Sequence, residues 1–99
     1  MAYDPGAIET ALASALGEST LLIAELRAAF FESAETHVAN LRRAETRKEW
    51  QDASGRLMGL AASFGAHRLM AAANALHALD RIDLAAVRKV DRIIAALRD

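Results

Sequence analysis

Apolar residues recur every three to four positions along almost the whole chain, and this spacing constrains the fold more than any other feature. It places apolar side chains on one face of an α-helix, whereas a strand requires a period of two. The chain contains one proline and few β-branched residues, while alanine, leucine, glutamate and arginine, which favour helices, are abundant. The sequence therefore predicts an all-α protein, and its 99 residues predict a single domain spanning residues 1–99.

Start and stop signals divide the first half of the chain into two expected helices. Asp4-Pro5 opens a short N-terminal helix, because aspartate caps helices and proline suits their first position. Gly17 is the expected stop, and a second helix begins at Ser19 or Thr20 and continues for about six turns. The apolar stripe of the first helix comprises Ile8, Leu12 and Leu16, and that of the second Ile23, Leu26, Phe30, Ala34, His37, Val38 and Leu41.

Three further helices are expected in the second half. Thr46 and Glu49 have the spacing of a capping box, so a helix should begin near Arg47 and end at about Phe64, before Gly65. The next helix spans about His67 to Leu79, and Asp83 caps the last. Because the connections are short, consecutive helices should be antiparallel neighbours. The expected architecture is an up-down antiparallel four-helix bundle with a short additional N-terminal helix.

Composition excludes several classes of partner and cofactor. The net charge of −1 provides no positive field for nucleic acid, and no apolar run is long enough to cross a membrane. The chain has no cysteine, and no two histidines lie three or four residues apart, so no metal site is expected. The N-terminus lacks the basic start of a secretion signal. We expect a cytoplasmic protein without cofactor, metal, nucleic-acid or membrane partner, and the sequence leaves its oligomeric state open.

The helix expected after Thr46 has an unusual outer face. Its core arc contains Trp50, Ala53, Leu57, Leu60, Ala61 and Phe64. Gly55, Gly59, Ala62 and Ala66 line up on the other side, with Asp52, Arg56 and Ser63 along the edges. Glycine inside a helix costs roughly 1 kcal/mol relative to alanine, but it allows another chain to approach closely. We expect Gly55 and Gly59 to be exposed. The small residues either seat the N-terminal helix or form a docking surface for a partner protein.

The span from about Ile8 to Leu97 resembles the histidine-phosphotransfer (HPt) domains of bacterial multistep phosphorelays. The HPt motif is Ala-His-x-Leu-Lys-Gly-Ser/Ala, followed later by Gly-Ala and a leucine. The matching residues here are Leu57, Gly59, Ala61, Gly65, Ala66 and Leu69. Phe30, Phe31 and Glu32 also resemble the aromatic-acidic signature of the preceding HPt helix. The resemblance implies a helical bundle that works with the receiver domains of response regulators.

Two departures from the HPt motif change the expected function. The phosphoacceptor histidine of the family falls on Gly55, and its lysine falls on Met58. Glycine has no nucleophile, so no catalytic residue is expected at that position. We therefore expect a degenerate HPt-like module that docks a receiver domain or a histidine kinase, without accepting phosphate and without being an enzyme. The expected docking residues are Asp52, Gly55, Arg56, Gly59, Ala62, Ser63, Ala66 and Arg68.

Two alternatives to this hypothesis remain open. One is an active phosphotransfer protein that uses another histidine, and the other is a structural or dimerising helical bundle unrelated to phosphorelays. His67 lies twelve residues beyond Gly55, roughly 18 Å along a continuous helix, which is too far to replace it. His37 is expected to be a partly buried, hydrogen-bonded core histidine, and His77 borders the inner face of its helix.

The acidic residues Glu45, Glu49 and Asp52 lie near one another on the glycine-containing helix. We interpret them as a solvated charged edge, with Arg56 at helical spacing from Asp52, rather than as acid-base catalysts.

Overall fold

The computed structural model describes residues 6, 8–10, 12 and 20–99, and these residues are mainly helical and contain no strand. This part of the chain contains the helices α2 (Thr20–Arg43), α3 (Arg47–Ser63), α4 (His67–Ala78) and α5 (Leu84–Arg98). Residues 8–10 and 12 are also helical. The expected first helix is supported at these positions, where Ile8 and Leu12 are buried. Its predicted signals at Asp4, Pro5, Leu16 and Gly17, and the alternative start at Ser19, lie outside the described residues.

The capping signals account for the bounds of α3 and α5. The Oγ of Thr46 accepts a hydrogen bond from the Glu49 backbone N–H, and the Glu49 carboxylate accepts one from the Thr46 N–H, both at 3.1 Å, so the predicted capping box is confirmed. Asp83 caps α5 by accepting a hydrogen bond from the Ala86 N–H at 3.2 Å. Gly65 has a φ of 69°, a left-handed conformation that ends α3 at little cost only for glycine.

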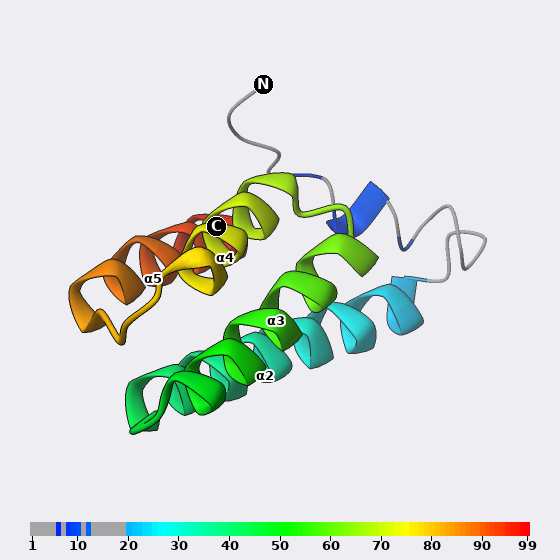
Figure 1. Cartoon of the computed structure of the whole chain (residues 1–99). Helices are drawn as coiled ribbons and strands as arrows, with labels where there is room; N and C mark the ends of the chain where they lie inside the picture. Colours follow the sequence, from blue (N-terminus) through cyan, green and yellow to red (C-terminus); the bar gives the residue numbers. More distant parts are fainter. Residues whose placement is uncertain (1–5, 7, 11, 13–19) are drawn as a thin grey trace.

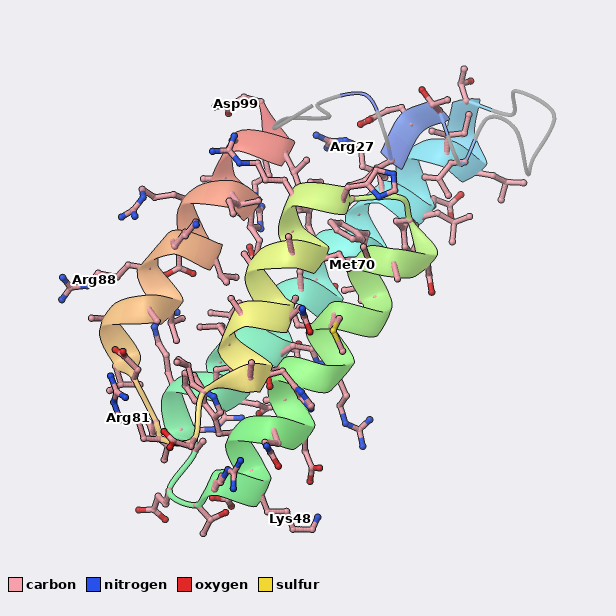
Figure 2. All side chains as sticks on the ribbon, turned by 45° about the horizontal axis from the view of Figure 1, so that its top comes forward. Arg27, Lys48, Met70, Arg81, Arg88 and Asp99 are labelled. Atoms are coloured by element: carbon pink, nitrogen blue, oxygen red, sulfur yellow. The ribbon has the colours of Figure 1, made fainter. Side chains whose placement is uncertain are left out.

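The four helices run alternately up and down along the long axis of the molecule (Figure 1). Arg27 and Asp99 lie toward one end in Figure 2, and Lys48 and Arg81 lie toward the other. Helix α3 packs against α2 and α4, and α5 packs against the same two helices. The connections between them cover only residues 44–46, 64–66 and 79–83, which favours antiparallel neighbours.

The core lies between the four helices and follows the predicted stripes at most positions, although Ile23, Leu26 and His37 of the α2 stripe are only half-buried. Trp50 is fully buried on α3, and its indole N–H donates a hydrogen bond to the Leu76 carbonyl of α4 at 2.8 Å. Leu60 and Phe64, predicted to lie within the core arc, are only half-buried at its margin. Phe31 is buried although it was not part of the predicted stripe, and its ring packs edge to face against that of Phe30.

Arg27 holds the end of α5 near the start of α2. Its guanidinium pairs with the Glu9 carboxylate at 2.5 Å and donates a hydrogen bond to the Arg98 carbonyl at 2.7 Å. It also lies 4.8 Å from the centre of the Phe31 ring. The Glu9 contact joins the described N-terminal residues to the remainder of the molecule. Within the described part of the chain, no helix has the length and apolar character that crossing a membrane requires.

Candidate functional site

The outer face of α3 carries five exposed residues that were predicted to form a docking surface. They are Asp52, Arg56, Gly59, Ala62 and Ser63, and we call them the α3 surface. Their spacing of three to four residues places them on one side of the helix. The opposite side contains Trp50, Ala53, Leu57 and Ala61, all buried against α2 and α4. The α3 surface therefore faces outward because the core fixes the rotation of the helix.

Gly59 is an open position of the α3 surface. A β-carbon added there would meet no atom within 4 Å beyond the glycine's own neighbours and helix backbone. The hydroxyl of Ser63 donates a hydrogen bond to the Gly59 carbonyl at 3.0 Å, so this side chain is folded back along the helix. Gly59, Ala62 and Ser63 therefore form a strip of small exposed residues at the carboxyl-terminal half of α3.

Gly55 differs from Gly59, because the predicted exposure of Gly55 is wrong. It is half-buried, and the imidazole of His77 on α4 lies beside it. A β-carbon at residue 55 would lie 3.6 Å from Cδ2 of His77 and 3.8 Å from its Nε2. The sequence spacing gave no sign of this contact, since the two residues are 22 positions apart and meet only because α3 and α4 pack together.

Two other residues of the predicted docking set lie away from the α3 surface. Ala66 is 0% exposed, so it cannot contribute to a docking surface. Its backbone N–H bonds to the Ala61 carbonyl at 2.9 Å as the chain turns after Gly65, which draws the residue into the core. Arg68 is exposed, but it lies nine residues before His77 on α4, which places the two about 180° apart on the helix. The structure therefore does not bring Arg68 together with the α3 surface.

Met58 is half-buried and packs against the core. The position that carries a lysine in the HPt motif thus carries an apolar side chain in this protein, directed partly inward. Neither Met58 nor Gly55 supplies a charge to the outer face of α3.

His37 on α2 is half-buried as predicted, but its predicted hydrogen bond is absent among the described residues. Its Nδ1 atom is buried and has no hydrogen-bond partner there. Burial lowers the pKa of His37 from its ordinary value, and the positive charge of Arg56 lowers this pKa further. Both effects favour the neutral imidazole. His67 is exposed at the start of α4, far along the chain from Gly55 as expected.

The charged edge of α3 is built from local pairs. The Lys48 ammonium contacts the Asp52 carboxylate at 3.0 Å, so the partner of Asp52 is Lys48 and not Arg56 as the spacing had suggested. Backbone hydrogen bonds from Glu45 and Thr46 lower the pKa of Glu49, because they stabilise its charged form. Both acidic side chains therefore have structural partners, as expected for a solvated edge.

A polar depression of about 280 Å³ adjoins this edge, between α2 and α3. It is lined by Asn40, Arg43, Ala44, Glu49, Asp52, Ala53 and Arg56. In the part of the chain that the structure describes, no three histidine or acidic side chains come together as a metal site would require. The depression borders the α3 surface and presents charges of both signs.

Comparison of the chain with protein-family models, with curated proteins and with solved structures gives no match.

Proposed function

We propose that this protein is an HPt-like module of two-component signalling that docks a receiver domain or a histidine kinase through the α3 surface. In this proposal the described helices form an up-down antiparallel four-helix bundle, with residues 8–12 belonging to an additional N-terminal helix. The observation that carries it is the open backbone at Gly59, next to the small side chain of Ala62 and the folded-back side chain of Ser63. A partner helix can approach such a face closely.

The proposed module does not itself carry phosphate at residue 55. Gly55 has no side chain, and the half-buried Met58 gives no cation that would attract a phosphoryl group. Docking without transfer would make the protein a competitor, a scaffold or a regulator of a phosphorelay. Arg56 and Asp52 flank Gly59 and would mainly affect the association rate and its salt dependence, since both are exposed.

A binding screen against purified receiver and kinase domains tests the proposal. At least one receiver or kinase domain should bind the wild-type protein. Gly59→Arg should abolish that binding, because the new side chain fills the open strip without entering the core. Ala85→Arg provides a matched control, since Ala85 is exposed on α5 and receives the same side chain. Binding that survives Gly59→Arg unchanged would contradict the proposed surface, and failure to bind any receiver or kinase would favour the alternative of a structural bundle.

One observation favours a second candidate function, phosphotransfer through His77. Its imidazole lies over Gly55, close to the place where the HPt phosphoacceptor would be. In such a reaction a nitrogen of His77 would form a bond to phosphorus, the bond between phosphorus and the receiver aspartate would break, and the carboxylate would be released. Incubation with a phosphorylated receiver followed by mass spectrometry tests this function. Acid-labile phosphate on the wild type that is absent from His77→Ala would support transfer, whereas no phosphate on the wild type would contradict it.

A further inference from the structure

A groove of about 400 Å³ runs between α4 and α5, away from the α3 surface. Leu76, Val90 and Ile93 line its floor and are largely buried. Alanines form much of the α4 rim, including Ala71 and Ala75, because α4 has too few large side chains to fill the space beside α5. On the α4 side, the groove is lined from Arg68 to Leu79, the residue that directly follows the helix, and this span is roughly 16 Å at 1.5 Å per residue. This is the length of three helical turns.

Positive charge gathers at one end of the groove. Lys89 lines it and also borders an adjoining depression, to which Arg68 and Arg92 contribute. Within the described residues, neither Lys89 nor Arg92 forms an ion pair or a hydrogen bond through its side chain. Asp83 lines the other end, but its carboxylate is already engaged in capping α5 and in a 3.7 Å contact with Arg81. Lys89 in the groove and Arg92 in the adjoining depression therefore present positive charge that no acidic side chain of the described residues pairs with, although the whole chain has a net charge of −1.

We propose that the groove between α4 and α5 binds an acidic amphipathic helix of a partner protein. The apolar face of that helix would cover Leu76, Val90 and Ile93, and its carboxylates would lie beside Lys89 and Arg92. The small side chains of the α4 rim permit close approach of a helix backbone, and the length of the groove matches three of its turns. An apolar stripe alone would not select an acidic partner, but the two unpaired cations do so by charge complementarity.

Binding in the groove does not depend on docking at the α3 surface. Arg68 marks the groove side of α4, and His77 marks the opposite side, where α4 contacts α3. One partner can therefore occupy the groove while another occupies the α3 surface.

Fluorescence anisotropy with two labelled peptides tests the groove proposal on the full chain. Both peptides are amphipathic 16-residue helices with leucines at spacings of three and four, and their remaining positions are glutamate in one and lysine in the other. The acidic peptide should bind saturably at low salt and more weakly as salt is added, because exposed charges are screened. No saturable binding of the acidic peptide, or equal binding of the two peptides, would overturn the proposal.

Charge variants distinguish the groove from a general attraction. Lys89→Glu should weaken binding of the acidic peptide by about tenfold or more, because it places like charges together. Arg88→Glu makes the same change in net charge on the same helix, but Arg88 projects away from the molecule (Figure 2) and does not line the groove. Arg88→Glu should change the affinity for the acidic peptide by less than about threefold, because salt screens the charge of an exposed residue outside the groove. Equal losses in these two variants would contradict binding in the groove.

Steric variants test the same point without changing charge. Ala75→Trp should block the groove and abolish peptide binding, whereas Asn74→Trp, at an exposed position outside the groove, should not. If Ala75→Trp does not fold, the comparison of Lys89→Glu with Arg88→Glu decides the matter. Gly59→Arg should leave binding of the acidic peptide unchanged. Peptide binding therefore tests the groove, and binding of receiver or kinase domains tests the α3 surface, so that either proposal can fail without the other.

Discussion

Substitution of Gly55 by alanine should stabilise the protein by roughly 1 kcal/mol. Glycine in a helix interior is less favourable than alanine by about this amount, because it loses more backbone entropy on folding. The added methyl group would lie 3.6 Å from the His77 ring, an ordinary van der Waals distance, so the structure predicts no steric cost. In a domain of 99 residues, this gain raises the midpoint of thermal unfolding by about 4–8 °C.

A larger side chain at residue 55 should destabilise the protein instead of stabilising it. Gly55→Leu places further carbons where the His77 ring lies, and such overpacking typically costs about 1–3 kcal/mol. His77→Ala should remove that cost, so the two substitutions together should show a favourable coupling in a double-mutant cycle. Gly59→Ala and Gly59→Leu are the matched controls, because nothing lies within 4 Å of a β-carbon at residue 59. Both controls should stabilise the helix.

Urea and thermal unfolding, followed by circular dichroism, measure these differences. Two results would refute these predictions. In the first, Gly55→Ala lowers the free energy of unfolding while Gly59→Ala raises it. In the second, Gly55→Leu and Gly59→Leu change the free energy of unfolding by the same amount. The first would mean that the α3–α4 interface is tighter than the 3.6 Å contact indicates. The second would mean that His77 does not occupy the space beside Gly55.

Three further predictions follow from the core, the helix stop and the buried histidine. Leu57→Ala should lower the free energy of unfolding by about 2–5 kcal/mol in urea titrations, because Leu57 is fully buried; a loss below about 0.5 kcal/mol would contradict its place in the core. Gly65→Ala should destabilise by about 1–2 kcal/mol, since its φ of 69° is unfavourable for alanine, and unchanged stability would contradict the turn. His37 has a lowered pKa in the folded state, so the unfolded chain binds its proton first. The free energy of unfolding should therefore fall as the pH drops below about 6.5, the ordinary pKa of histidine. Unfolding of the wild type and of His37→Gln at pH 7.5 and 5.5 checks this, and the fall should be smaller in His37→Gln.

Local signals predicted much of the fold. Thr46 and Glu49, Asp83 and Gly65 each act on residues at most four or five positions away, so the sequence alone reveals their hydrogen bonds and the resulting helix ends. The apolar period predicted the burial of Trp50 and Leu57 for the same reason, since a helix fixes which residues share a face.

Capping signals and the apolar period could not predict the contacts between helices. The period of α3 placed Gly55 and Gly59 on one small-residue face, but only the packing of α4 decides that His77 covers the first and leaves the second open. Ala66 was predicted on that face as if α3 continued, whereas the turn at Gly65 directs it into the core. Arg68 was predicted to belong to the same docking surface as the glycines, yet α4 carries it toward α5.

The different environments of the two glycines narrow the proposed docking surface. A partner that approaches α3 meets open backbone at Gly59, but at Gly55 it meets the His77 ring. Docking that required contact with residue 55 would have to displace this ring, and removing His77 would then strengthen binding. Docking through Gly59 alone would be insensitive to His77→Ala but would be lost in Gly59→Arg. The effect of His77→Ala on receiver binding therefore determines whether the partner uses the whole small-residue face of α3 or only its carboxyl-terminal half.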